Sequence, residues 1–240
     1  MTKLLYPVCL DVDGRTCLVV GGGSVACRKV RGLLACGARV RVISPALCPE
    51  LGCLAAEGRL DWQARPYQEG DLEGAFLVLA ATGEPEVQEA VFREAQARGV
   101  LVNVADVPSR CTFTLPAVVR SGDLTVAVAT GGKSPALAKR LRQELTRAFG
   151  PEYAELLRIL GAFRQEVLAA GRPQVENEEI FTRLLHHDIL DWMRARDWER
   201  LAAHFQAVLG RPVSAALLAR LAAGLPVQAA LGSTPPPAAS

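Results

Sequence analysis

Three consecutive glycines at positions 21–23 follow the apolar run Thr16–Val20 and precede a helical pattern that opens at Ser24. Glycines let the backbone turn tightly and approach a pyrophosphate, and the free N–H groups at the start of a helix attract its charge. Counted from the first glycine, the spacing is G-x-G-x-x-A and ends at Ala26. The pattern predicts the strand, phosphate-binding turn and helix of a dinucleotide-binding fold; a tight turn of purely structural use is the alternative.

The first 104 residues alternate strand-like and helix-like segments. This alternation predicts a right-handed, doubly wound parallel sheet, and we assign residues 1–111 to such an α/β, Rossmann-like domain. The uninterrupted apolar run 76–81 is typical of a parallel strand that is buried on both faces. The expected strands are 16–20, 39–44, 60–65, 76–81 and 100–104, and the expected helices are 24–36, 46–57 and 86–98.

The pattern changes after this region. Two strand-like segments, 112–120 and 124–129, are separated by a turn too short for parallel neighbours, so they predict a β-hairpin. Ser134 and Pro135 suit the N-cap and the first position of a helix over 136–149. We assign 112–150 to a dimerisation and substrate-binding segment, 151–231 to a helical domain with helices at 153–169, 180–194 and 198–209, and 232–240 to a disordered tail.

The composition argues against several classes of protein. A formal charge of +2 argues against nucleic-acid binding by bulk electrostatics, and no apolar run approaches the ~20 residues of a membrane span. No signal peptide is visible, and the seven cysteines, which lack a C-x-x-C spacing, are interpreted as small buried hydrophobes in a reducing cytoplasm. All three histidines follow residue 185, so we expect no Cys/His metal site in the nucleotide-binding fold.

Polar residues stand at the carboxyl ends of the expected strands, where open α/β sheets bind their ligands. Ser44–Ala46 replaces the acidic residue usual in NAD folds; its serine can hydrogen-bond a ribose, and since no arginine follows, we expect NAD rather than NADP. Asn103 and Asp106 lie at the end of the strand 100–104. An aspartate there can accept a proton while a hydride leaves toward a nicotinamide. A cap on the turn before Pro108 is an equally weighted alternative.

The segment Gly132–Ser134 looks like half of a P-loop. A complete motif needs a glycine where Ala127 stands, so we do not expect ATP hydrolysis. A helix start preceded by a lysine is still a good carboxylate site, and basic residues outnumber acidic ones over 106–147. Positive charge beside a hydride-transfer site predicts a polyanionic substrate; a solvated amphipathic helix accounts for part of this charge equally well. The candidate substrate-binding residues are Arg110, Lys133 and Ser134.

Six motifs in order carry a family resemblance. They are VVGGGSVAxRK at 19–29, VISP at 42–45, AAT at 80–82, NVADVP at 103–108, FTLPA at 113–117 and GGKSP at 131–135. Over roughly residues 1–165 the chain resembles the siroheme synthase family of precorrin-2 dehydrogenases and sirohydrochlorin ferrochelatases. The resemblance implies NAD-dependent oxidation of precorrin-2, a tetrapyrrole polycarboxylate, to sirohydrochlorin by a homodimer with interlocked segments. The chain is too short to hold the methyltransferase domain of fused siroheme synthases, and the residues leave iron insertion open.

The resemblance also assigns roles to residues. The general base falls on Asp106. The sequence departs from the family at Gly83 and Glu84, which replace an acidic pair. Two rival interpretations stay open: a non-catalytic NAD-sensing module, and a tetrapyrrole or metal carrier without the redox step. The candidate dinucleotide contacts, from the resemblance and from the strand ends together, are Gly21, Gly22, Gly23, Ser24, Val25, Ser44, Pro45, Ala46, Thr82 and Asn103.

Overall fold

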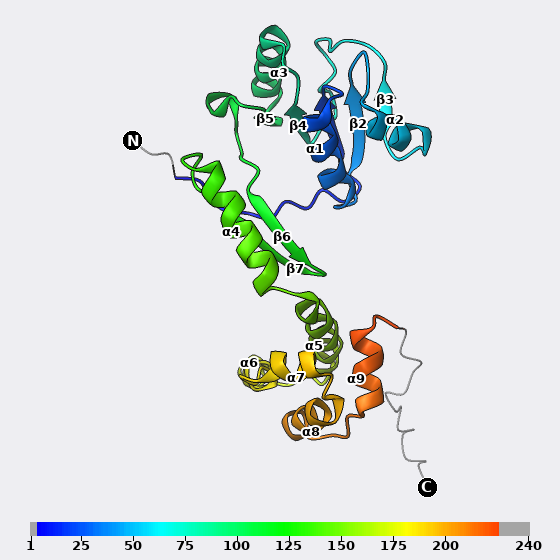
Figure 1. Cartoon of the computed structure of the whole chain (residues 1–240), viewed down its shortest axis with the longest axis vertical. Helices are drawn as coiled ribbons and strands as arrows, with labels where there is room; N and C mark the ends of the chain where they lie inside the picture. The colour runs from blue at the N-terminus through cyan, green and yellow to red at the C-terminus, as the bar shows by residue number, and fades with distance from the viewer. Residues whose placement is uncertain (1–3, 226–240) are drawn as a thin grey trace. The chain divides into compact units, whose positions relative to one another are not determined.

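A computed structural model describes residues 4–225 of the chain as two compact units (Figure 1). The first unit contains the described residues up to Leu115 together with Gly131–Lys133. The second contains Pro116–Thr130 and the described residues from Ser134 onward. The predicted tail at 232–240 and the end of the predicted helical domain lie outside the described residues. Within 4–225, no helix is both long and apolar enough to cross a membrane.

The first unit is built on a sheet of five parallel strands in the order β3-β2-β1-β4-β5, which confirms the predicted doubly wound fold. The strand order reverses between β1 and β4, and sheets of this kind bind ligands at that switch point, beyond the carboxyl ends of the strands. The strands are β1 (Thr16–Val20), β2 (Arg39–Ile43), β3 (Asp61–Gln63), β4 (Leu77–Ala80) and β5 (Leu101–Val104). The helices between them are α1 (Ser24–Leu34), α2 (Pro49–Ala56) and α3 (Pro85–Arg98).

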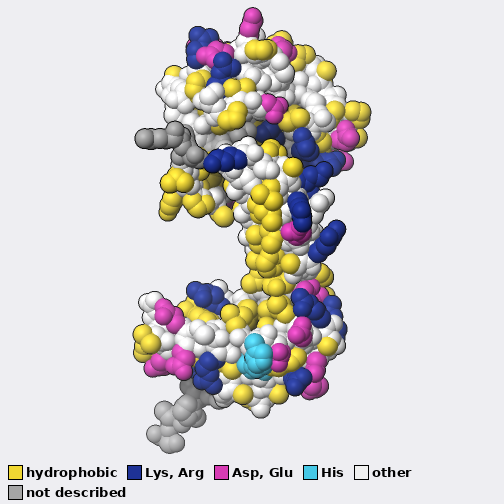
Figure 2. All heavy atoms as spheres, turned by 60° about the vertical axis from the view of Figure 1, so that its left-hand side comes forward, with side chains coloured by type: hydrophobic (Ala, Val, Ile, Leu, Met, Phe, Trp, Pro, Cys, Tyr) yellow, Lys and Arg dark blue, Asp and Glu magenta, His cyan; other side chains and the backbone are white. Residues whose placement is uncertain are grey.

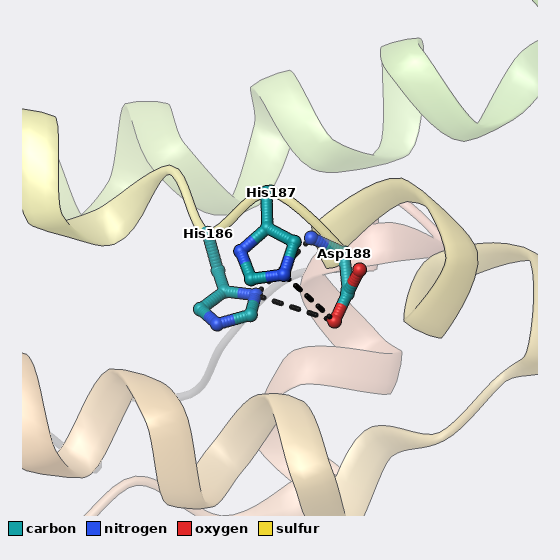
Figure 3. Close-up of side chains that lie close together, drawn as sticks. All are labelled: His186, His187 and Asp188. Atoms are coloured by element: carbon teal, nitrogen blue, oxygen red, sulfur yellow. Dashed lines mark hydrogen bonds and ion pairs between the residues drawn. The ribbon is translucent and has the colours of Figure 1, made fainter.

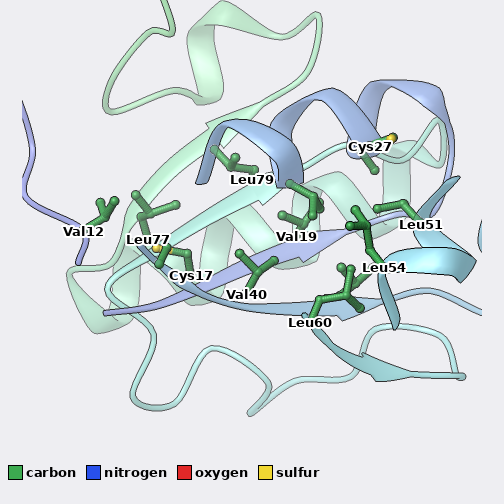
Figure 4. Packing of buried hydrophobic residues seen from close by; sticks show 14 residues of the cluster. Val12, Cys17, Val19, Cys27, Val40, Leu51, Leu54, Leu60, Leu77 and Leu79 are labelled. Atoms are coloured by element: carbon green, nitrogen blue, oxygen red, sulfur yellow. The ribbon is translucent and has the colours of Figure 1, made fainter. Parts of the chain in front are cut away.

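Helices cover both faces of this sheet. Alternate residues of each strand point to opposite sides, so a strand that is apolar throughout needs cover on both. On one face, Cys17 and Val19 of β1 enter a buried cluster with side chains of α1 and α2 (Figure 4). On the other face, Leu18 and Val20 enter a second cluster with side chains of α3. A strand that is buried on both faces is apolar throughout, and this is why the runs at β1 and β4 predicted those strands to within one residue.

The second unit begins with the predicted hairpin, whose strands pair antiparallel. The first of them starts later than expected, just after Pro116, which has no N–H to donate to a ladder. The strands are β6 (Ala117–Ser121) and β7 (Leu124–Val128). The helices are α4 (Pro135–Ala148), α5 (Pro151–Ala169), α6 (Gln174–Leu184), α7 (Ile189–Ala195), α8 (Trp198–Leu209) and α9 (Ala215–Ala222).

Two parts of the helical region differ from the prediction. The single helix expected over 180–194 is two helices, α6 and α7. Between them, the N–H of Asp188 donates to Nδ1 of His186 (3.1 Å), and a side-chain acceptor of this kind competes with the helical ladder. Helix α9 is not among the predicted helices, although Ser214 caps it by accepting the N–H of Leu217 (3.1 Å).

Helix α4 has no buried residue, unlike the helices that follow it. Its apolar face, formed by Ala138, Leu141 and Leu145, is half-buried, and Leu137 is 47% exposed. Figure 2 shows hydrophobic side chains exposed over the hairpin and α4, with Lys and Arg side chains beside them. Helices α5–α9, in contrast, enclose a core of their own that includes Phe163. The apolar face of α4 is therefore incompletely covered within the described chain.

All seven cysteines are free thiols. Cys17 and Cys27 are buried, as expected for small hydrophobes. Cys9 and Cys53 are exposed, and the remaining three are half-buried. The interpretation of the cysteines as buried residues therefore holds for two of the seven.

Candidate active site

The three glycines of the turn between β1 and α1 have different surroundings. Gly21 has a φ of +117°, and a Cβ there would collide with the carbonyl oxygen of Ala81. A Cβ on Gly22 would collide with the carbonyl oxygen of Ala46. At Gly23, in contrast, a Cβ would meet no atom within 4 Å. Packing and conformation within the chain therefore require glycine at the first two positions and leave the third facing open space.

That open space lies at the start of α1. Gly23 is the N-cap residue, and its backbone is extended (φ −86°), so no positive φ demands a glycine there. No side chain caps the helix. The first N–H groups of a helix, here those of Ser24 and Val25, have no partner within the helix and carry the positive end of its dipole. An uncapped helix start beside an open glycine is a cradle for an anionic group such as a pyrophosphate.

The loop after β2 packs directly against this turn. The N–H of Cys48 donates to the carbonyl oxygen of Gly22 (2.7 Å), and the hydroxyl of Ser44 donates to the carbonyl oxygen of Ala46 (2.8 Å). Ser44 is buried, with 9% of its surface exposed, while Pro45 and Ala46 are exposed. The Ser44 hydroxyl proton is therefore already used in a hydrogen bond within the loop. Pro45 and Ala46 form the accessible surface of this loop.

The loop after β4 forms the opposite side of the turn. Thr82 follows Ala81, the residue whose carbonyl approaches Gly21. Its hydroxyl accepts the N–H of Glu84 (3.2 Å), and its carbonyl accepts a hydrogen bond from Nε2 of Gln88 (2.7 Å). Thr82 is thus held by the first turn of α3 at the carboxyl end of the sheet.

The end of β5 joins the sheet to α1 through Asn103. This side chain is 9% exposed, and its Oδ1 accepts a hydrogen bond from Nζ of Lys29 (2.9 Å). Its Nδ2 donates to the carbonyl oxygen of Phe113 (3.1 Å). Both ends of the Asn103 amide are therefore occupied by partners within the chain.

Lys29 is absent from the residues selected from the sequence. It lies on α1 between Ala26 and Leu33, at the three- and four-residue spacings of one helix face. This spacing places a lysine among apolar residues on the helix face that is directed at the sheet. That unusual position is the signal from which the sequence could have indicated Lys29. Burial lowers the pKa of Lys29, while the negative charge of Asp106 acts in the opposite direction.

Asp106 follows β5 on a left-handed turn. Its φ is +61°, and within residues 4–225 only Arg196 shares such a conformation among the non-glycine residues. Aspartate is one of the few residues that adopt this conformation at modest cost. The turn carries the chain off the sheet, and the Asp106 side chain is exposed at the carboxyl edge.

The candidate substrate residues do not form one cluster within a unit. Arg110 belongs to the first unit and makes an ion pair with Glu89 of α3 (2.6 Å). Lys133 is exposed and is also grouped with the first unit. Ser134 belongs to the second unit, where its hydroxyl caps α4 by accepting the N–H of Leu137 (3.2 Å).

A separate group of side chains lies between α6 and α7. Figure 3 shows His186, His187 and Asp188 turned toward one another. The distances from Oδ2 of Asp188 to Nδ1 of His186 and Nε2 of His187 are 3.9 and 3.3 Å. The lone pair on Nδ1 of His186 already accepts the N–H of Asp188, and this ring stacks on Trp192. These contacts account for the group as the closure of the turn between the two helices.

Comparisons with known proteins agree with this geometry. A family model described as putative NAD(P)-binding matches residues 8–117, and one described as sirohaem biosynthesis protein central matches residues 121–148. Siroheme synthase 1 of Aeromonas salmonicida is 39% identical over 190 residues, which are 79% of this chain and 41% of the relative. The siroheme synthase of Methylobacillus flagellatus is 45% identical over 161 residues, or 67% of this chain and 34% of the relative.

The chain therefore spans less than half the length of these relatives. Among solved structures, SirC, a precorrin-2 dehydrogenase, is similar with a TM-score of 0.69 and 27% identity, over 86% of this chain and 100% of that one. The matched residues include the glycine turn and Asp106 in the first model and all of α4 in the second. The chain is therefore similar to siroheme synthases over a putative NAD(P)-binding region and a sirohaem biosynthesis central region, residues 8–117 and 121–148.

Proposed function

We propose that this chain oxidises precorrin-2 to sirohydrochlorin with NAD as the hydride acceptor, a step of siroheme biosynthesis. The observation that carries the proposal is the open cradle at Gly23 together with the exposed carboxylate of Asp106 at the same edge of one sheet. The similarity to a precorrin-2 dehydrogenase over that protein's full length supports the substrate.

The residues around the turn fit a dinucleotide. A pyrophosphate would lie against Gly23 and accept the N–H groups of Ser24 and Val25, while Pro45 and Ala46 would support the adenosine. Gly21 and Gly22 hold the turn beneath it, and Thr82 and Asn103 complete the carboxyl edge. No lysine or arginine stands in the loop directly after Ser44 to bind the 2′-phosphate of NADP. We therefore expect NAD to bind more tightly than NADP. When bound, NAD accepts the hydride.

Asp106 then has one defined task. Oxidation at carbon releases a proton as well as a hydride, and the proton needs a positioned base. The carboxylate of Asp106 accepts it at the carboxyl edge of β5. A substrate with many carboxylates also needs cations, for which we propose Arg110 and Lys133 of the first unit. The start of α4 at Ser134 is proposed as a carboxylate site of the second unit. Arg110 would share its guanidinium between Glu89 and the substrate.

The test is turnover of precorrin-2 by the purified protein with NAD, followed by the absorbance of sirohydrochlorin. Asparagine has the shape of aspartate and also tolerates a positive φ, so the fold and the affinity for NAD should persist in Asp106→Asn. Loss of a general base should slow turnover by about 10²–10⁴-fold. Wild-type turnover in the variant would make Asp106 a turn residue, and absence of turnover in the wild type would favour an NAD-sensing module or a carrier.

We further propose that the chain acts as a homodimer through the hairpin and α4. No residue of α4 is buried, and its apolar face is only half-buried where it packs on the hairpin. A second copy that covers the apolar face of α4 would supply the missing burial in a symmetric interface. Sedimentation of the full chain should then give twice the mass of one chain, and a monomer at micromolar concentration would contradict the interface.

The free cysteines bear on the compartment. Seven thiols without a disulfide fit a reducing environment, in which unpaired cysteines persist. We propose the cytoplasm as the site of action. Fractionation of cells that produce the tagged protein, with a cytoplasmic and a membrane marker, checks this assignment.

A further inference from the structure

The clamp around Asp106 consists of hydrogen bonds on both sides of this residue. On the N-terminal side, Asn103 is fixed by Lys29 and by Phe113. On the C-terminal side, the thiol of Cys111 lies 3.4 Å from the carbonyl oxygen of Val107, and it also accepts the N–H of Val104 (3.3 Å). The segment 103–107 is therefore held at both ends while its centre takes a left-handed turn.

Lys29 is the charged member of this clamp. The other contacts are made by an amide, a thiol and main-chain groups, all from β5 and the segment that follows it. Lys29 comes from α1, which begins at the glycine turn. Its side chain thus joins the helix that starts at the cofactor cradle to the strand that ends at the base.

We infer that Lys29 is a positioning residue of the proposed dehydrogenation, which holds the end of β5 through Asn103 so that the Asp106 carboxylate faces the reacting carbon. This inference rests on the proposed function. An ammonium group has three donors, and Asn103 takes one of them. The charge of the Asp106 carboxylate also acts on Lys29.

A purely structural role does not explain a lysine at this position. Its neighbours on the helix face, Ala26 and Leu33, are apolar, and an apolar residue at 29 would avoid the cost of removing an ammonium from water. That cost is visible in the lowered pKa of Lys29, whose largest cause is burial. A half-buried charge that an apolar residue could replace indicates a task beyond packing.

Direct binding of the pyrophosphate does not explain it either. Lys29 stands five residues beyond Ser24, the first residue of α1, which corresponds to about 7.5 Å along the helix axis. The N–H groups that face an anion belong to the first turn. The amine of Lys29 is instead directed across the sheet to Asn103.

The test is Lys29→Met, which keeps the length and the helix propensity but removes the charge and the donor. Arg28→Met is the matched control, because it removes one exposed positive charge from the next position of the same helix. Lys29→Arg restores both charge and donor. All variants are measured for kcat and KM with precorrin-2, for NAD affinity by calorimetry, and for hydrogen exchange of the amides at 105–107.

Lys29→Met should lower kcat about 10- to 100-fold, because small displacements of a catalytic group cost rates of this order. NAD affinity and KM should stay within about twofold of the wild type, and exchange at 105–107 should rise. Lys29→Arg should recover part of kcat, and Arg28→Met should behave as wild type.

When the wild type is active and Lys29→Met folds, three results overturn the inference. A Lys29→Met enzyme with wild-type kcat leaves the lysine without a positioning task. A change confined to KM makes it a substrate contact, and a loss of NAD affinity makes it part of the cradle. If the wild type turns over no precorrin-2, the proposed function fails. Unchanged hydrogen exchange of the amides at 105–107 in Lys29→Met would then show, independently, that Lys29 does not hold this segment. If Lys29→Met does not fold, a Lys29→Arg enzyme that folds but keeps the full loss of kcat also contradicts the inference.

Discussion

Strand β4 of the first unit and helix α4 of the second bury their apolar residues to different degrees. Every residue of β4 is buried in the first unit, whereas none of the 14 residues of α4 is buried in the second. The sequence pattern is equally clear in both, an uninterrupted apolar run in one and helical spacing in the other. The difference teaches that periodicity predicts an element, but says nothing about what covers its apolar face.

The same division separates the two kinds of proposed role. The glycine turn and the end of β5 belong to a well-packed part of the first unit, and sites on well-packed elements hold their side chains with little freedom. Helix α4, with its exposed apolar face, is the element to which we give the interface between copies. Three groups of substitutions break or sharpen this comparison.

The largest effect is expected from Leu79→Ala in the first core, set against Leu141→Ala on α4. Leu79 is 2% exposed and packs between the sheet and its helices (Figure 4), so its truncation should lower the free energy of unfolding by about 2–5 kcal/mol. Leu141 is half-buried, and its loss should change the stability of one chain by less than about 1 kcal/mol while weakening the dimer.

Urea unfolding of the two variants measures the first difference, and sedimentation over a range of concentrations measures the second. Two results would show that α4 is covered within its own chain. One is a Leu141→Ala protein that dissociates at the same concentration as the wild type, and the other is a Leu141→Ala protein that loses as much stability as Leu79→Ala.

The second substitution tests the open glycine. Gly23→Asp places a carboxylate in the proposed pyrophosphate site, and NAD affinity should fall at least about 100-fold, or 2.7 kcal/mol. The protein should still fold, since a Cβ at Gly23 meets no atom within 4 Å. Gly32→Asp is the matched control, because it places the same residue in open space later in α1.

Calorimetry with NAD gives both affinities, and Gly32→Asp should bind as the wild type does. Gly22→Ala should instead reduce stability, because its Cβ would meet the carbonyl oxygen of Ala46. Equal NAD binding by the Gly23→Asp and Gly32→Asp proteins would place the cofactor elsewhere.

The smallest effect concerns Glu94, a buried carboxylate in the first unit. Burial raises its pKa, but hydrogen bonds from Tyr67, the N–H groups of Gly70 and Leu72, and Arg98 outweigh this and hold the pKa below its ordinary value of 4.5. A lowered pKa stabilises the fold above the ordinary value, and the contribution is lost as the pH falls through the lower, folded value.

Glu94→Gln should therefore cost about 1–3 kcal/mol at pH 7, since several donors lose their charged acceptor. The gap between variant and wild type should narrow as the pH falls below 4.5. Urea unfolding at a series of pH values measures this gap. A gap that stays constant with pH would mean that Glu94 contributes through packing alone.

The sheet and most helices could be predicted from the sequence because their signals are local. Apolar runs marked β1 and β4, and Ser134 with Pro135 marked the start of α4. The segment between α6 and α7 contains no Gly or Pro that would indicate a break. The break depends on the hydrogen bond from the N–H of Asp188 to His186, which no sequence pattern predicts.

The sequence offers the candidate site as a set of residues, but it does not contain the contacts among them. Asn103 was expected at the edge facing the cofactor, yet its amide is turned to Lys29 and Phe113. That orientation depends on the rotation of α1 against β5, which no short motif contains. Likewise, the three glycines are identical as letters, and only their neighbours separate Gly23 from the other two.

The loop after β2 has a consequence for how this chain could change over time. Its main chain is fixed by the bonds between Cys48 and Gly22 and between Ser44 and Ala46, while the side chains at 45 and 46 are exposed. Residues at these two positions can therefore be exchanged without disturbing the turn that they flank. Under the proposed function, single substitutions at 45 and 46 would change which nucleotide a descendant of this chain prefers, while the main chain of the glycine turn stays the same.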